Sequence, residues 1–276
     1  MKAARFDYVR VTTCAEAARL LAHSNGMGKV VAGWQSLGPM LNLRLAQPEL
    51  LVDVTAIAEL AAVRREPDAI TLGACTRHAA IEDGVVPDVT AGLMPFVAHG
   101  IAYRAVRNRG TLGGSLAHAD PAADWVSVMA LLDAQCVVVG TQGPRTVAWA
   151  DWMQGAFTTA LAEDEVLTAV RIPALSPTAR WSYEKWNRKP GEFAHAIAAF
   201  LCDPARGISR AVIGGTDGAP HVVHDARSLL DERHAEAAVA TLAGARIEPA
   251  TFEYRIHEVT LKRAARRLRD MDRRAA

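Results

Sequence analysis

Apolar and polar positions along the first third of the chain predict one helix and three short strands. Thr13 and Glu16 have the spacing of a capping box, and apolar residues follow at helical spacing until Asn25-Gly26. Short apolar runs predict strands at 29–31, 50–54 and 70–72. This mixture of helix and strand is typical of α/β or α+β domains.

The rest of the chain predicts further strands and then helices. Pro121 suits the first turn of a helix that runs to Leu132. Strands are expected at 136–139, 145–149, 166–172, 181–186, 194–201 and 208–213, with the first two forming a hairpin. Helical patterns follow at 226–230, 235–242 and 257–274. The two prolines within 173–177 mark the best domain boundary, so a small α+β domain is expected after it.

Composition narrows the class of protein. The 276 residues are 50% hydrophobic and 22% charged with a net charge of +1, which allows one large or two ordinary domains and gives no reason to expect nucleic acid or an anionic membrane as partner. Charges interrupt the first eight residues, so no secretory signal is expected, and no apolar run approaches the ~18 residues of a transmembrane helix. We therefore expect a cytoplasmic protein.

The four cysteines are widely spaced, at Cys14, Cys75, Cys136 and Cys202. No CxxC or CxH cluster exists, so we expect reduced, mostly buried thiols and no zinc or iron–sulfur site. The last 22 residues carry eight Lys/Arg and three Asp/Glu. They are interpreted as an amphipathic helix with Leu261, Ala264, Ala265, Leu268 and Met271 on its buried face; docking to an acidic partner and nucleic-acid binding are the weaker alternatives.

Two glycine-bearing segments carry the candidate chemistry. The first is AGWQSL at 32–37, after a predicted strand and before a helix expected near Ser36; the second is the loop RGTLGGS at 109–115. Glycine lets an anion approach the backbone closely, and consecutive N–H groups form a concave donor nest. Either segment alone also fits an ordinary turn. Neither a GxGxxG after a strand nor a GxxxxGK[ST] motif is present, so Rossmann and P-loop sites are not supported.

The residues around these segments are more specific. VVAGWQSLGPMLNLRL at 30–45 closely resembles the first flavin loop of the FAD-binding subunits of molybdenum hydroxylases. That family includes the medium subunits of carbon monoxide dehydrogenase and of N-heterocycle hydroxylases, and the flavin domain of xanthine dehydrogenase. RNRGTLGGSLAHADPAAD at 107–124 resembles the second loop, and SYEK at 182–185 resembles the start of the family's C-terminal domain.

The resemblance implies an α+β fold. It places a p-cresol-methylhydroxylase-type FAD-binding domain at 1–175, with two α+β subdomains at about 1–56 and 57–175. A small α+β C-terminal domain of the CO-dehydrogenase-flavoprotein type would cover 178–276.

The resemblance also implies the site residues. The first loop would cradle the FAD diphosphate through Val31, Ala32, Gly33, Trp34, Gln35, Ser36 and Leu37, and the second would close over it through Thr111, Gly113, Gly114 and Ser115. Ile101 would line the pocket, Asp124 would bind a polar part of the cofactor, Leu167 and Lys185 would lie near the isoalloxazine, and Tyr183 could gate access to it. The alternatives are a surface carboxylate for Asp124, a solvated strand residue for Lys185, and plain core for Ile101 and Leu167.

Two details of these motifs stay open. Trp34 stands where the family usually has a second glycine, and we expect an ordinary φ there, with the indole pointing away or covering part of the cofactor. His118 and Asp120 have the look of half a metal site, but no third ligand is evident, so hydrogen bonds that fix the loop are expected and no metal.

By the same resemblance, the chain would be the electron-transfer subunit of a larger enzyme. Electrons would come from [2Fe–2S] clusters on a small subunit, after substrate oxidation at a molybdopterin cofactor on a large subunit, and would leave to an external acceptor; a dimer of heterotrimers is expected. One alternative is a self-contained flavin-dependent oxidase or dehydrogenase, and another is a non-enzymatic module with degenerate loops.

Overall fold

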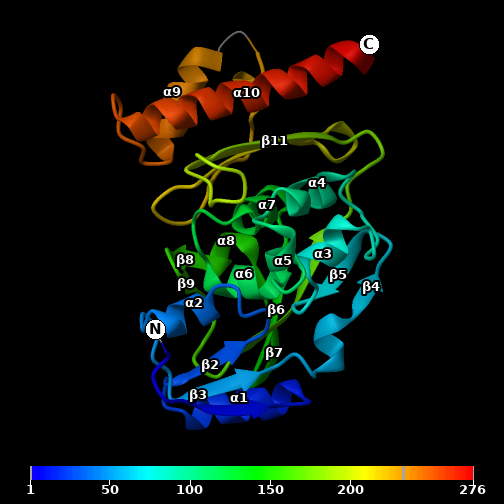
Figure 1. The fold of residues 1–276 in the computed structure, drawn as a ribbon. Coiled ribbons are helices and arrows are strands. Elements are labelled where there is room, and N and C mark those ends of the chain that lie inside the picture. The colour runs from blue at the N-terminus through cyan, green and yellow to red at the C-terminus, as the bar shows by residue number, and fades with distance from the viewer. Residues whose placement is uncertain (1, 232–233, 276) are drawn as a thin grey trace.

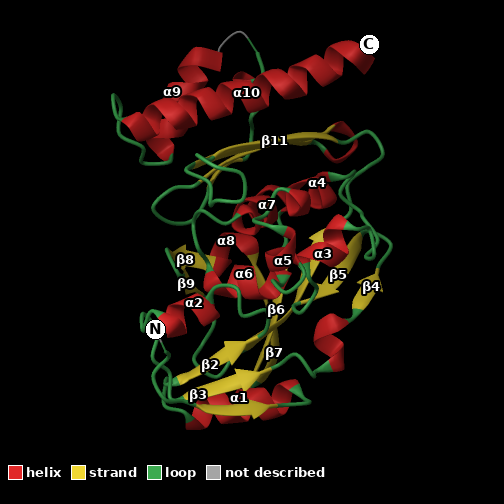
Figure 2. Cartoon of the chain, in the orientation of Figure 1, coloured by secondary structure: helices red, strands yellow, loops and turns green. Residues whose placement is uncertain are grey.

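Three main sheets follow one another from the N-terminal end of the molecule to the C-terminal end, with helices between and over them (Figure 1). The structure is a computed structural model that describes residues 2–231 and 234–275. Helix and strand content is mixed throughout, so the predicted α+β class is confirmed (Figure 2).

The N-terminal layer is a parallel three-stranded sheet in the order β1-β3-β2. Its elements are β1 (Asp7–Arg10), α1 (Cys14–His23), β2 (Gly28–Val31), α2 (Leu37–Asn42) and β3 (Leu50–Asp53). The Thr13 cap is confirmed, since its Oγ1 accepts from the Glu16 N–H at 3.2 Å; the Glu16 carboxylate accepts from the N–H of Thr12 at 3.3 Å, one residue before the position that a capping box pairs. Asn25 and Gly26 both have positive φ and end the helix, as the sequence indicates.

The middle layer is an antiparallel five-stranded sheet in the order β4-β5-β10-β6-β7. Its strands are β4 (Val63–Arg65), β5 (Ala69–Gly73), β6 (Gln135–Gly140), β7 (Gly143–Ala148) and β10 (Val166–Pro173). The short helices and the small hairpin of this layer are η1 (Ala58–Ala61), α3 (His78–Glu82), α4 (Leu93–His99), α5 (Arg104–Arg107), α6 (Leu112–His118), α7 (Asp124–Leu132), α8 (Trp149–Trp152), β8 (Met153–Gly155) and β9 (Thr158–Thr159).

The C-terminal layer is an antiparallel four-stranded sheet in sequence order, with α10 lying across it (Figure 1). Its elements are β11 (Arg180–Trp186), β12 (Ala196–Asp203), η2 (Pro204–Arg206), β13 (Ile208–Gly214), β14 (His221–Val223), η3 (Arg227–Leu229), α9 (His234–Gly244) and α10 (Phe252–Ala275).

Helix α7 lies between the middle and C-terminal layers, and all nine of its residues are buried. Strand β12 is buried on both faces, because α7 packs on one face and α10 on the other. Ile197 and Ala199 pack in the cluster that contains α7, whereas Ala198 and Phe200 pack in the cluster beneath α10. The two layers therefore share α7 as a common wall.

Some expectations need correction. The helix predicted from Pro121 begins only at Asp124, because Asp120 holds a turn first: its side chain accepts from the Ala122 N–H at 2.9 Å and its carbonyl from the Ala123 N–H. The helical pattern at 226–230 is a single 3-10 turn, and strands β1, β4, β8, β9 and β14 were not expected.

The basic C-terminal helix, α10, is amphipathic and covers β11 and β12 of the C-terminal sheet. Leu261, Ala264, Ala265 and Leu268 are buried beneath it as predicted, but Met271 is 36% exposed. Arg267 of the same helix pairs with Glu184 of β11 at 3.1 Å. All four cysteines are free thiols, two buried and two half-buried. None of the helices that the structure describes is long and apolar enough to cross a bilayer.

Candidate functional site

The two predicted loops meet backbone to backbone. A Cβ added to Gly33 would lie 2.5 Å from the carbonyl oxygen of Arg109 and 2.9 Å from the Cα of Gly110. Real Cβ atoms do not come that close to backbone, so only glycine lets the first loop reach the second. Segments about 75 positions apart in the sequence therefore form one continuous surface.

The first loop presents a row of unpaired donors. Within the described part of the chain, the N–H groups of Gly33, Trp34, Gln35 and Ser36 have no protein acceptor. Gln35 folds back, and its side-chain amide donates to the Gly33 carbonyl at 2.9 Å. The loop is half-buried between buried Val31 and the start of α2 at Leu37, as the sequence predicts. Consecutive free amides of this kind suit an anionic ligand.

Trp34 departs from what the sequence led us to expect. Its φ is +66°, in the left-handed region, so the prediction of an ordinary φ is wrong. This residue lies in the turn from β2 into α2, where its carbonyl accepts from the Gly38 N–H. The indole stacks on the ring of Tyr8, with 6.5 Å between centroids, and packs near Val31 and Leu41. This packing offsets part of the roughly 1–2 kcal/mol that a left-handed residue costs.

Two glycines of the second motif, Gly113 and Gly114, lie in the first turn of α6 instead of in an open loop. Thr111 caps that helix, and its hydroxyl accepts from the Gly114 N–H at 3.0 Å. Gly113 is buried against β5, where its N–H donates to the Ala74 carbonyl and an added Cβ would lie 2.4 Å from the Ala74 Cβ. Gly114 is exposed and Ser115 is half-exposed. Gly113 therefore serves packing, and Gly114 and Ser115 form the accessible edge of α6.

His78 packs beside Gly110 and Trp125, and no sequence signal singled it out. Its Nδ1 accepts from the Trp125 indole N–H at 3.0 Å, and a Cβ on Gly110 would lie 2.8 Å from its ring. Burial, with a smaller contribution from the nearby Arg107 charge, lowers the pKa of His78 to about 4. The ring is therefore neutral at physiological pH, with its proton on Nε2.

A second group of predicted residues gathers around the buried carboxylate of Asp124, the first residue of α7. The Tyr183 hydroxyl donates to Asp124 Oδ1 at 2.6 Å, and Lys185 Nζ lies 3.0 Å from both carboxylate oxygens. Lys185 also donates to the Gly100 carbonyl at 2.8 Å, beside Ile101. The alternatives of a surface carboxylate for Asp124 and a solvated side chain for Lys185 are therefore wrong.

Tyr183 is buried, and burial together with the neighbouring Asp124 charge raises its pKa well above the ordinary value. Its hydroxyl is tied to that carboxylate. Leu167 is buried in β10 opposite Val138. The next residue, Thr168, accepts from the Ala74 N–H, so Leu167 lies one position from the contact that supports Gly113.

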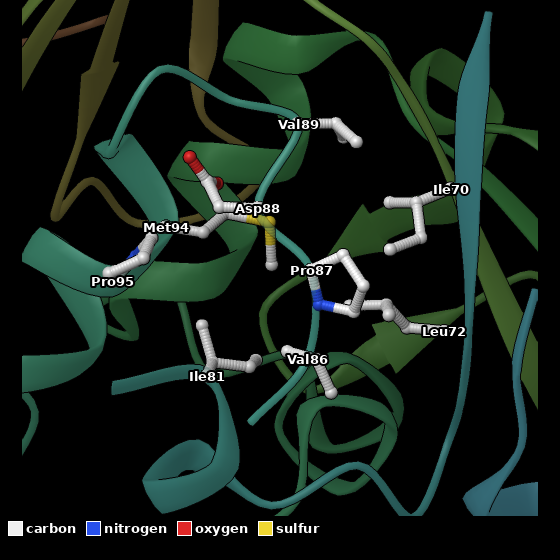
Figure 3. Close-up of a pocket in the computed structure, with 9 residues that line it drawn as sticks. All are labelled: Ile70, Leu72, Ile81, Val86, Pro87, Asp88, Val89, Met94 and Pro95. Atoms are coloured by element: carbon white, nitrogen blue, oxygen red, sulfur yellow. The ribbon is translucent and has the colours of Figure 1, made fainter. Parts of the chain in front are cut away.

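Two hollows lie outside these groups. The cavity in Figure 3, between β5, α3 and α4, measures about 10 Å³ and is lined mostly by apolar side chains such as Ile70, Leu72 and Met94, so it has room for one water at most. A groove of about 480 Å³ runs between Asp120–Ala122, Phe157 and the C-terminal layer at Arg188 and His195.

No three metal-ligand side chains converge in the part of the chain described. His118 packs on Phe157 and Asp120 fixes its own turn, the loop-fixing role expected for it.

Comparisons with known proteins agree with this geometry. Residues 4–175 match the model of the family described as the FAD binding domain in molybdopterin dehydrogenase. The chain is 33% identical to the 6-hydroxypseudooxynicotine dehydrogenase complex subunit alpha of Paenarthrobacter nicotinovorans, over 90% of this chain and 86% of that one. It is 36% identical to the carbon monoxide dehydrogenase medium chain of Hydrogenophaga pseudoflava, over 71% and 69% of the two chains. A solved structure of carbon monoxide dehydrogenase from that organism superposes with a TM-score of 0.88 at 31% identity, covering 97% of this chain and 98% of that one.

Proposed function

Because this chain belongs to the family of FAD-binding domains of molybdopterin dehydrogenases, we propose that it is the electron-transfer subunit of a heteromeric molybdenum hydroxylase. In this proposal a small subunit delivers electrons from [2Fe–2S] clusters, and a large subunit oxidises the substrate at its molybdopterin cofactor. This chain passes the electrons to an external acceptor. The assembly is a cytoplasmic dimer of heterotrimers.

The contact between Gly33 and Arg109–Gly110 is the observation that carries the proposal. It joins the segment whose N–H groups at 33–36 are free to the segment that leads into α6, where Gly114 and Ser115 form the accessible edge. A diphosphate needs several donors on one concave backbone and close approach without a Cβ, and the two loops meet both needs. The residues present therefore fit FAD.

We assign the diphosphate to Val31–Leu37 with Thr111, Gly114 and Ser115, and the ring system to the side of Ile101, Leu167, Asp124 and Lys185; Gly113 holds this segment against Ala74 instead of binding the cofactor. FAD accepts and releases electrons singly or in pairs, which suits a subunit between one-electron clusters and an acceptor. The chain binds and orients the cofactor. The Lys185–Asp124 pair, with Tyr183 on the same carboxylate, sets the local charge.

The layered fold supports a division into an FAD-binding domain at 1–175, with subdomains at about 1–56 and 57–175, and a C-terminal domain at 178–276. Each part has its own sheet, and β10, the last strand of the middle sheet, ends at Pro173.

Purification of the chain with its partners from the native host tests the proposal. We expect one complex that contains FAD, molybdenum and iron, and in which this chain holds the flavin. The isolated chain reconstituted with FAD should turn yellow yet oxidise no organic substrate by itself. Turnover by the isolated chain would instead indicate a self-contained oxidase, and failure to retain FAD would overturn the proposal.

A further inference from the structure

Arg107 connects the two halves of the assigned cofactor site, although neither the sequence motif nor the comparisons give it a role. It ends α5, and the carbonyl of the preceding residue, Val106, accepts from the N–H groups of both Arg109 and Gly110. The segment that meets Gly33 therefore starts directly from the backbone that carries Arg107.

The side chain of Arg107 points to the other half. Its Nη1 donates to the Ile101 carbonyl at 2.9 Å and to the Ala102 carbonyl at 3.2 Å. Lys185 holds the preceding carbonyl, that of Gly100, at 2.8 Å. Lys185 and Arg107 thus hold three consecutive carbonyls, those of residues 100 to 102. The middle carbonyl is that of Ile101, a residue assigned to the cofactor pocket.

The held segment is strained. Ala102 has a φ of +44°, a left-handed conformation that an alanine adopts only when its surroundings impose it. The Arg107 guanidinium provides such a constraint, because it is itself fixed. It is buried, and Glu82 accepts from its Nε at 2.7 Å and from its Nη2 at 2.9 Å. This pairing also lowers the pKa of the Glu82 carboxyl.

We propose that Arg107 is a positioning residue for the flavin. It fixes the distance between the diphosphate loop and the 100–102 segment, and through Gly100 it fixes Lys185 relative to Asp124. The inference rests on the proposed function, since it assumes that FAD spans these two halves. Arg107 itself touches neither the phosphates nor the ring in this scheme.

Arg104 offers a matched control. It lies on the same short helix and also pairs with Glu82, at 3.0 Å, but it is far more exposed and donates to Asp83 and Asn108 instead of the 101–102 carbonyls. Arg107→Lys keeps the positive charge beside Glu82. A single ammonium cannot hold a bidentate carboxylate and two carbonyls in one plane as a guanidinium does.

The experiment compares FAD dissociation constants and flavin reduction potentials of the reconstituted full chain. We expect Arg107→Lys to weaken FAD binding about ten-fold or more and to shift the potential, and Arg104→Ala to leave both close to wild type. Adding Ala102→Gly to Arg107→Lys should restore much of the affinity, since glycine adopts the left-handed conformation without the guanidinium. A purely structural role for Arg107 would give no such rescue.

Thermal unfolding without FAD checks that each variant is folded. If Arg107→Lys does not fold, Glu82→Asp replaces it: one methylene less draws the guanidinium away from the carbonyls, and the same losses and the same rescue by Ala102→Gly are expected. Equal FAD affinity and reduction potential in the Arg107 and Arg104 variants would overturn the inference, and so would the absence of rescue by Ala102→Gly. FAD binding by the wild-type chain would in that case still support the proposed function. A wild-type chain that binds no FAD would overturn both.

Discussion

Lys185 Nζ lies 3.0 Å from each carboxylate oxygen of Asp124, although the two residues are 61 positions apart. The pair is mostly buried, so its charges are screened little by water. We expect Lys185→Met to lower the flavin reduction potential and Asp124→Asn to raise it, because reduction adds negative charge near the pair. Each shift should be roughly 30 mV, equivalent to about 1.4 kcal/mol for a two-electron couple. Redox titration measures it, and potentials unchanged in both variants would place the ring elsewhere.

Gly33→Ala should weaken FAD binding at least about ten-fold, or about 1.4 kcal/mol, since the new Cβ would push the first loop off the Arg109 carbonyl. Gly38→Ala is the matched control, because its Cβ would lie 3.8 Å from Trp34, an ordinary contact. Fluorescence titration with FAD measures both. Equal affinities would mean that the contact between the loops does not matter for the cofactor.

Gly114→Val and Gly113→Val should fail in different ways. Gly114 is exposed and its Cβ would meet only the Thr111 hydroxyl, so the variant should stay folded yet lose FAD. Gly113 is packed against Ala74, and overpacking there should cost about 1–3 kcal/mol of stability or more. Apo-chain melting and bound-flavin absorbance distinguish the two outcomes. Full flavin occupancy in Gly114→Val would remove this edge from the site.

Trp34→Gly should be more stable than Trp34→Ala by about 1 kcal/mol. Both variants lose the stacking on Tyr8, but only alanine bears the roughly 1–2 kcal/mol cost of the +66° φ. Glycine loses part of this advantage, because its greater freedom in the unfolded chain disfavours folding. Urea unfolding of the two apo-variants measures the difference. Alanine as the more stable variant would show that the left-handed turn relaxes when the indole is removed.

His78 should make the chain less stable in mild acid. Its pKa is about 4 in the folded chain against roughly 6.5 unfolded, so between these values the unfolded chain binds more protons. The free energy of unfolding should therefore fall by up to about 3 kcal/mol as the pH drops from about 6.5 to 4. His78→Asn retains an acceptor for Trp125 but cannot titrate, and should flatten this dependence. Some slope should remain, because burial also lowers the pKa values of His118 and His221.

The sequence predicted the elements that local pattern controls. The Thr13 cap, the longer strands of each layer and most of the buried face of α10 needed only periodicity and capping, whereas the short strands β1, β4 and β14 were missed. The family resemblance located both glycine segments and the Asp124–Lys185 group. It could not show that Gly33 abuts Arg109, because that contact depends on packing between segments far apart in the chain.

Two errors have the same origin. Trp34 was expected at an ordinary φ, yet the turn between β2 and α2 and the Tyr8 ring impose the left-handed one. Pro121 was expected to start a helix, yet the Asp120 side chain holds a separate turn. In both places tertiary or side-chain contacts outweigh local preference. The roles of His78 and Arg107 could not be predicted because they depend on buried hydrogen bonds to Trp125 and Glu82, which lie far away in the sequence.

Helix α7 packs through its buried residues against both the middle and the C-terminal layers and carries Asp124 at its first turn. A chimera that grafts the C-terminal sheet of a relative onto this chain would therefore have to bring along the matching face of this helix. Without it, repacking against the new sheet would tilt the helix and carry the carboxylate away from Lys185. Exchange of the C-terminal domain is thus constrained by the first turn of α7, which lies about 50 residues before the domain boundary at 173–177.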